Sequence, residues 1–169
     1  DDHGSVLYVG TFSKVMFPSI RLGYLVLPAS LVEVFGKAKW FADRQPPTLS
    51  QYALAEFIVA GHLERHIRKM RLCYERRRSA LVRALYQYFG DRVEILGDSA
   101  GLHVMARLPI ALSDEAVVAR AASVDVEMCS ARGQYEAPRN TGEFVFGYTA
   151  IDEAQIKTGI RLVAQALQP

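Results

Sequence analysis

The sequence has few cysteines and no long hydrophobic run. Its 169 residues contain two cysteines, Cys73 and Cys129, which lie far apart and form no CxxC pair. That spacing favours free thiols in a reducing, cytoplasmic compartment. No run of about 18 apolar residues occurs, which excludes a membrane-spanning helix.

An excess of charge of either sign is also missing. The net charge is +2, which is too small to indicate a nucleic-acid-binding protein by itself. Half of the residues are hydrophobic and 22% are charged, so the chain can bury a core and is not disordered. Asp1 and Asp2 do not suit a signal peptide. A chain that begins Asp-Asp-His-Gly-Ser, without Met, is expected to be a piece of a longer protein.

The stretch from Tyr8 to Pro28 predicts a strand, a loop and a second strand. Val6–Val9 and Leu22–Leu27 are short apolar runs, and each stops at a turn residue. Their nearly continuous apolar character is typical of strands that are covered on both faces. The loop between them carries two hydroxyls and two cations: Thr11, Ser13, Lys14 and Arg21.

An anionic ligand accounts for these four side chains. Cations between buried strands are unfavourable unless they are paired or used covalently. Hydroxyls and a guanidinium suit a phosphate, and a desolvated lysine suits a Schiff base. Taken alone, Ser-x-Lys is a common pair, and it fits a surface lysine in a loop equally well.

The longer segment GTFSKVMFPSIRLGY resembles the cofactor-lysine segment of the pyridoxal-phosphate enzymes of aminotransferase class I/II, which have fold type I. The resemblance implies that Lys14 forms the Schiff base with pyridoxal 5′-phosphate. It also implies that Arg21 and Thr11 hold the cofactor phosphate, with Ser13 as a further candidate.

After this stretch, the apolar residues recur with helical periodicity. It predicts a helix over Ala29–Phe41 with Ser30 as its N-cap, and a second helix from about Thr48 in which Leu54, Phe57 and Ile58 face inward. The longest pattern runs from His62 to about Phe89. A helix of that length is expected to bridge two substructures, with a domain boundary inside it.

The remainder alternates strands and helices, which predicts an α+β sandwich with helices on one face of a sheet. The whole chain is then of α/β to α+β class: the end of a large domain over 1–60, a connecting helix over 61–90 and a small C-terminal domain over 91–169. The predicted strands are Val93–Leu96, Leu102–Leu108, Val124–Cys129 and Phe144–Tyr148, and a loop is predicted over Arg132–Gly142. The predicted helices are Asp114–Ala122, capped by Ser113, and a last helix that Asp152 caps and that runs through Leu167.

Three segments resemble the aminotransferase-like half of the MocR-type subfamily of GntR bacterial regulators: GHLERHIRKMRLCYERRRSAL, GLHVMARLP and FVFGYTAIDEAQIKTGIRLVAQAL. Such regulators join an N-terminal winged-helix DNA-binding domain to a fold type I domain. The resemblance implies an amine or amino-acid effector, a homodimer, and DNA bound through a domain absent from this chain.

The chain departs from the family in two respects. The family's aspartate that pairs with the pyridine nitrogen lies well upstream of the lysine, and Asp1 and Asp2 are too near Lys14 to be that residue. Cofactor binding by this chain alone is therefore expected to be weak or absent. Many aminotransferases also carry a carboxylate-binding arginine where this chain has Val145, so a regulatory role is expected rather than a catalytic one. A genuine aminotransferase, and a dimerisation module that has lost the cofactor, are the alternatives.

The long helix raises two further possibilities. His62 and His66 have a spacing that can chelate zinc, but Leu63 stands where the metalloprotease motif has glutamate, so no metal site is predicted. The stretch from Gly61 to Arg92, which includes this helix, carries nine Lys and Arg against three acidic residues. A surface that binds the phosphates of a nucleic acid has this composition. The solvent-exposed face of a helix in a larger protein has the same composition.

Overall fold

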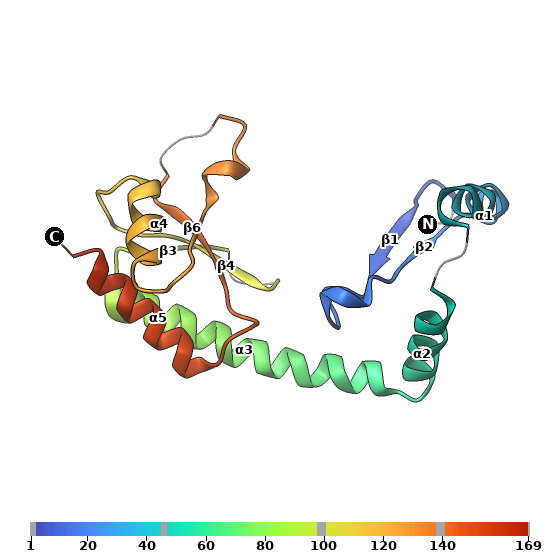
Figure 1. The fold of residues 1–169 in the computed structure, drawn as a ribbon, viewed down its shortest axis with the longest axis horizontal. Helices are drawn as coiled ribbons and strands as arrows, with labels where there is room; N and C mark the ends of the chain where they lie inside the picture. Colours follow the sequence, from blue (N-terminus) through green and yellow to red (C-terminus); the bar gives the residue numbers. More distant parts are fainter. Residues whose placement is uncertain (1–2, 45–46, 98–100, 138–140, 169) are drawn as a thin grey trace. The chain divides into compact units, whose positions relative to one another are not determined.

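The computed structural model of this chain describes residues 3–44, 47–97, 101–137 and 141–168. It comprises two compact units, Asp1–Lys69 and Met70–Pro169. Helix α3 (His62–Phe89) contains the boundary between them and has the range that the periodicity predicts (Figure 1). Among the helices in the described ranges, none combines the length and the apolar character that crossing a bilayer requires.

The first unit opens with a two-stranded antiparallel sheet. Strand β1 (Tyr8–Thr11) pairs with β2 (Gly23–Val26), and the short 3-10 helix η1 (Pro18–Ile20) lies in the segment that connects them. Leu22 is buried, but most strand side chains are exposed, and Val9 is 73% exposed. The apolar pattern is that of strands covered on both faces, but in this chain a sheet of two strands leaves most of its apolar side chains in solvent.

Two helices complete the first unit. They are α1 (Ala29–Asp43) and α2 (Thr48–Val59), close to the predicted ranges. The predicted N-cap at Ser30 is wrong: Pro28 occupies that position, and no side chain caps the first turn. Leu54 is buried and Phe57 is half-buried, whereas Ile58 is exposed, contrary to the prediction that it faces inward. The break between the helices includes Gln45 and Pro46, which lie outside the described residues.

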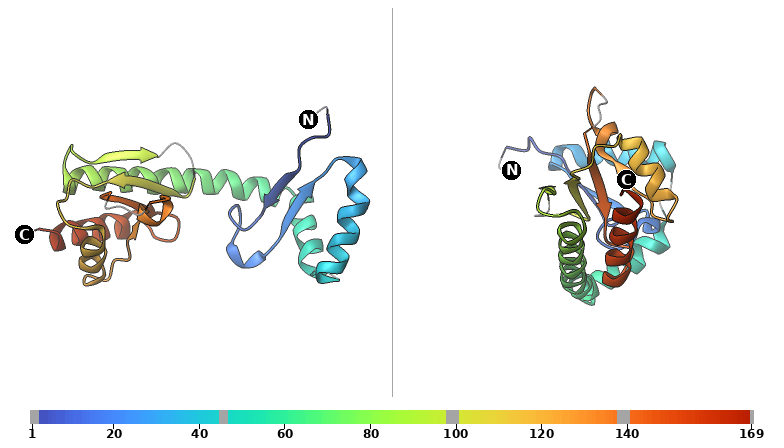
Figure 2. Two further views of the ribbon diagram at one scale, coloured as in Figure 1. Left: turned by 90° about the horizontal axis from the view of Figure 1, so that it is seen from above. Right: turned by 90° about the vertical axis from the view of Figure 1, so that its left-hand side faces the viewer.

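The second unit is built on a four-stranded antiparallel sheet with the strand order β3-β4-β6-β5. Figures 1 and 2 show α5 running alongside the second half of α3, with α4 beside it. These three helices cover one face of the sheet, as the alternation of strands and helices predicts. The elements are β3 (Glu94–Gly97), β4 (His103–Arg107), α4 (Asp114–Ala122), β5 (Cys129–Ser130), the 3-10 helix η2 (Ala131–Gln134), β6 (Glu143–Gly147) and α5 (Glu153–Ala166).

The strand predicted over Val124–Cys129 begins only at Cys129. Asp125 has a left-handed backbone (φ 58°), and the Val126 N–H donates back to the carbonyl of Ala121 at 3.1 Å. These residues therefore close the end of α4 instead of extending along β6, which shortens β5 to two residues. The predicted cap of α4 is confirmed, because Ser113 Oγ accepts a hydrogen bond from the Ala116 N–H at 3.2 Å.

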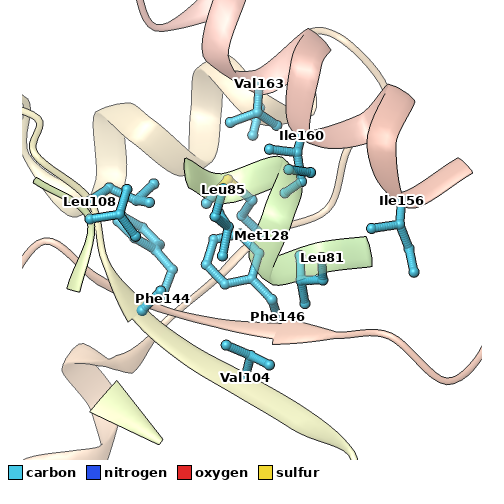
Figure 3. Close-up of a cluster of buried hydrophobic side chains, with 14 of the residues drawn as sticks. Leu81, Leu85, Val104, Leu108, Met128, Phe144, Phe146, Ile156, Ile160 and Val163 are labelled. Atoms are coloured by element: carbon cyan, nitrogen blue, oxygen red, sulfur yellow. The ribbon is translucent and has the colours of Figure 1, made fainter. Parts of the chain in front are cut away.

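The core of the second unit lies between the sheet and the helices. Successive strand residues point to opposite faces, so Phe144 and Phe146 face the helices while Val145 faces away from them. Figure 3 shows these two rings among apolar side chains from α3, β4 and α5. The labelled side chains of this cluster are Leu81, Leu85, Val104, Leu108, Met128, Phe144, Phe146, Ile156, Ile160 and Val163.

A buried carboxylate fixes the segment that precedes β6. Asp114 is 1% exposed and lies in the first turn of α4, where the helix dipole favours a negative charge. It accepts hydrogen bonds from Ser130 Oγ at 2.9 Å and from the Gly142 N–H at 2.9 Å. Asp114 thereby holds both ends of the segment between β5 and β6 against α4, an arrangement called here the Asp114 clamp.

Candidate cofactor-binding turn

The four predicted site residues lie on the turn that joins β1 to β2. Thr11 ends β1, and its Oγ1 accepts a hydrogen bond from the Ser13 N–H at 3.2 Å and donates one to the Leu22 carbonyl at 3.4 Å. The Phe12 N–H donates to the same carbonyl at 3.0 Å. The two arms of the turn are therefore fastened together directly beside Arg21.

The backbone between the arms folds into a tight turn around Lys14. The Phe12 carbonyl accepts the N–H groups of Val15 at 3.2 Å and Met16 at 2.8 Å. The Lys14 side chain is exposed, and it makes no hydrogen bond or ion pair with any described residue. The argument from burial of the cations is thus wrong for this chain, in which both Lys14 and Arg21 are exposed.

Arg21 has a strained backbone. Its φ of 49° and ψ of 34° lie in the left-handed region, which residues with a Cβ adopt at a free-energy cost. Such strain gathers at functional positions, where the side chain is needed despite the unfavourable backbone. No acidic residue occurs from Thr11 to Arg21, and within the described part of the chain the guanidinium has no carboxylate partner.

Two glycines and a tyrosine set the close approach of the strands. A Cβ on Gly23 would lie 2.8 Å from the carbonyl oxygen of Gly10, and a Cβ on Gly10 would overlap the ring of Tyr24. A hydrogen bond to Tyr8 raises the pKa of the Tyr24 phenol above its usual 10.0. The sequence pattern includes Gly23 and Tyr24 without revealing their steric role, which emerges from the register of β1 and β2.

Known proteins resemble the chain along its whole length. It is 33% identical over 169 residues to the uncharacterized HTH-type transcriptional regulator YhdI of Bacillus subtilis, covering 100% of this chain and 36% of the relative. It is 33% identical over 167 residues to the probable rhizopine catabolism regulatory protein MocR of Rhizobium meliloti, covering 98% and 34%. The chain therefore spans about a third of the length of these regulators, and no family model matches it.

The fold agrees with a crystal structure of Pyrococcus horikoshii kynurenine aminotransferase in complex with PMP. The TM-score is 0.84 at 26% identity, and the match covers 99% of this chain and 41% of the enzyme. The chain carries the C-terminal part of a fold type I aminotransferase domain, most like that of MocR-type regulators. Similar regulators and similar aminotransferases both cover nearly all of it, so the family includes transcription regulators and transferases.

The sheet face where many fold type I enzymes carry a carboxylate-binding arginine is apolar in this chain. Val145 pairs with Met105 of β4 on one side and with Cys129 of β5 on the other. None of these three side chains carries a positive charge, so this row offers no ion-pair partner to a carboxylate.

Arg107 and Arg132 of the second unit form ion pairs with carboxylates. Arg107 pairs with Glu94 and, at 2.6 Å, with the buried Glu143; the hydrogen bond to Glu143 is the main reason that the pKa of Arg107 is raised. Arg132 forms an ion pair with Glu115. The described part of the chain also contains no group of three His, Cys, Asp or Glu that could hold a metal ion.

Proposed function

We propose that this chain is the pyridoxal-phosphate-binding and effector-binding region of a GntR/MocR-type transcriptional regulator. The observation that carries the proposal is the turn between β1 and β2, in which Lys14 and Thr11 accompany a strained, carboxylate-free Arg21. Arg21 has a backbone conformation that is unfavourable for a residue with a side chain, and its guanidinium suits a phosphate.

The residues of this turn fit the cofactor. Arg21 would bind its phosphate through a guanidinium fork, assisted by the hydroxyls of Thr11 and Ser13. The 3.4 Å hydrogen bond from Thr11 to the Leu22 carbonyl is long, so its hydroxyl hydrogen can turn to an incoming phosphate oxygen. Lys14 offers a primary amine with no competing partner among the described residues. When bound, pyridoxal phosphate supplies an aldehyde that condenses with primary amines and a ring that withdraws electrons.

The domain assignment belongs to the same proposal. Residues 1–60 belong to the large cofactor-binding domain, 61–90 form the connecting helix, and 91–169 form the small C-terminal domain. The groups that contact the cofactor ring then lie upstream of this chain. We therefore propose that the chain alone binds pyridoxal phosphate weakly or not at all, although the full-length protein binds it.

A regulatory role fits the cations of the second unit better than a catalytic one. Transamination of an α-amino acid requires a firm hold on its carboxylate, and an arginine provides this best. Val145 stands where many aminotransferases have that arginine, and Arg107 and Arg132 are occupied by glutamates. Arg139, a further arginine in the predicted loop before Phe144, lies outside the described residues. The effector is then an amine or amino acid whose binding changes how the protein acts on DNA, through a separate winged-helix domain, in the cytoplasm.

The second candidate is a genuine aminotransferase. It is favoured by the agreement of fold with an aminotransferase structure over 99% of the chain. The two candidates share the cofactor and differ in the fate of the bound amine. An amine that alters DNA binding without being converted supports the regulator, and rapid conversion of the amine supports the enzyme.

We also propose a homodimer, which would use the exposed sheet of the first unit. Val9, Leu25 and Val26 are all about half exposed or more, and two unpaired strand edges invite pairing with another chain. Light scattering over a range of protein concentrations tests this point. A monomer at every concentration would contradict it.

The proposed function is tested by the Lys14→Ala variant of the full-length protein. The wild type is expected to gain a visible absorbance band with pyridoxal phosphate and, after borohydride reduction, a stable adduct that peptide mass mapping places on Lys14. Lys39→Ala is the matched control, because Lys39 pairs with Asp43 on α1 and should not affect the adduct. An adduct on Lys37, Lys39 or Lys69 in the wild type would disprove the assignment.

A further inference from the structure

Four basic side chains lie together at the start of α3. His62, Arg65, His66 and Lys69 have the spacing i, i+3, i+4 and i+7, which places them on one face of the helix. Together with Phe57 of α2 they line a shallow, open hollow of about 330 Å³ within the first unit. The rings of Phe57 and His62 are 5.3 Å apart, so α2 forms one wall of the hollow. This set of five residues is called the α3 groove.

The basic side chains of the α3 groove have no acidic partner among the described residues, unlike Lys37, Lys39 and Arg68 of the same unit. None of its five side chains is acidic, and its four basic side chains form no ion pair with any described residue. Among the cations of the first unit outside the groove, Arg68 is ion-paired with Glu64 at 3.3 Å, and Lys37 with Glu33 at 2.6 Å. An anion that enters the groove therefore meets cations that it need not share with a protein carboxylate.

We propose that the α3 groove binds the sugar-phosphate backbone of duplex DNA. At 1.5 Å per residue, the rise from His62 to Lys69 is about 10 Å, which matches about three phosphates of one strand along the duplex axis. The N-terminus of α3 adds a partial positive charge at the same end. The groove holds cations but no amide side chain of the kind that reads bases, so it contacts the backbone and not the sequence.

This inference rests on the proposed regulator in one respect, since a regulator brings DNA to the protein. It assigns to the aminotransferase-like region a direct contact with DNA, in addition to the contact made by the separate winged-helix domain. Because Arg65 and Lys69 are exposed and lie on a helix, glutamine at both positions removes the charge while keeping a good helix former.

The test measures the binding of a fluorescein-labelled, mixed-sequence DNA duplex to the 169-residue chain by fluorescence anisotropy, without cofactor, over a salt series. The wild type is expected to show a log–log salt slope of about −2 or steeper. In Arg65→Gln/Lys69→Gln the slope should become shallower by about 1.8, with at least about tenfold weaker binding at low salt. The control Lys37→Gln/Lys39→Gln changes the net charge equally at two ion-paired lysines and should retain most of the binding.

Three results would overturn the proposal. Equal losses in the two double variants would mean that only net charge matters. Binding of polyglutamate as tight as that of the duplex at equal salt would indicate an acidic protein segment as the occupant. Absence of salt-dependent binding by the wild type would leave no DNA contact to explain. Circular dichroism of each variant verifies the helix content. Because no cofactor is present, failure of the Lys14 assignment would not alter any of these results.

Discussion

The carbonyl oxygen of Gly10 lies so close to Gly23 that a Cβ added to Gly23 would be only 2.8 Å away from it. The contact is to backbone, which cannot rotate aside as a side chain can. Gly23 is paired with Thr11 and stands two residues after Arg21, so this close approach fixes the spacing of the two arms of the proposed phosphate site.

Gly23→Ala is therefore expected to force β1 and β2 apart. We expect a loss of about 1–3 kcal/mol in the free energy of unfolding of the chain, typical of an overpacked site, and weaker cofactor binding by the full-length protein. Urea unfolding and a cofactor titration measure the two effects. Gly36→Ala is the matched control: apart from its chain neighbours and the backbone of α1, no described atom lies within 4 Å of the added Cβ, so helix propensity should stabilise the chain by about 0.5–1 kcal/mol. Similar results for the two variants would contradict the steric argument.

Replacement of Arg21 should separate stability from binding. Arg21→Gly relieves the left-handed backbone and should raise the free energy of unfolding of the chain by up to about 1 kcal/mol. The same variant of the full-length protein should bind pyridoxal phosphate about 10- to 150-fold more weakly, since a charge-assisted contact contributes about 1.5–3 kcal/mol. Arg21→Ala removes the guanidinium but keeps the strain, so it should weaken binding without the gain in stability. Unchanged binding in both variants would remove Arg21 from the site.

The full-length protein should convert common α-amino acids slowly or not at all. Val145 offers no charge to a substrate carboxylate, which forfeits about 1.5–3 kcal/mol, or roughly a 10- to 150-fold slower reaction. Absorbance at the cofactor band, recorded after mixing the cofactor-loaded protein with a panel of amino acids, measures the half-reaction. Val145→Arg should accelerate it, and Val145→Leu is the uncharged control. Conversion within seconds by the wild type would support the aminotransferase over the regulator.

The second unit should lose stability at high pH through Tyr148. Its hydroxyl donates to the Gly101 carbonyl at 2.7 Å, and burial raises the pKa of Tyr148 above the usual 10.0. Folding therefore favours the neutral phenol, so its stabilisation is complete below pH 10 and is lost as the pH rises through the folded pKa. Tyr148→Phe should lower the free energy of unfolding at pH 7 by about 0.5–1.5 kcal/mol and weaken its decline at alkaline pH. Tyrosinate absorbance follows the ionisation of the phenol, and circular dichroism follows unfolding over the same pH range. If the variant lost stability at alkaline pH as the wild type does, other groups would be responsible.

The elements with strong local signals could be predicted from the sequence. The apolar stripe of α3 and the caps of α4 and α5 gave the right helices, because 3.6-residue periodicity and capping are properties of short segments. Asp152 forms a full capping box with Gln155. The strand that contains β5 was predicted to start too early, at Val124 instead of Cys129, since its start depends on a left-handed Asp125, which no local sequence pattern indicates.

The candidate site was predictable in composition but not in conformation. The residue types of Thr11, Ser13, Lys14 and Arg21 suggested phosphate chemistry. In the structure Thr11 ends β1, and the other three lie in the segment that joins β1 to β2. The strain at Arg21 and the steric need for Gly23 depend on strand register, which links positions about a dozen residues apart. The ion pairs of Arg107 and Arg132 could not be predicted from the sequence either, since each joins separate elements of the second unit.

The Asp114 clamp also determines where this chain can accept extra sequence. Because Ser130 and Gly142 are held to the same carboxylate, these two anchors stay in place when sequence is inserted between Glu136 and Ala137, which only lengthens the loop between them. The entropy of closing such a loop grows only by about 0.6 kcal/mol for each doubling. A peptide tag or a reporter inserted there should leave β5 and β6 paired, whereas a single residue inserted between Thr141 and Gly142 would pull an anchor away from Asp114.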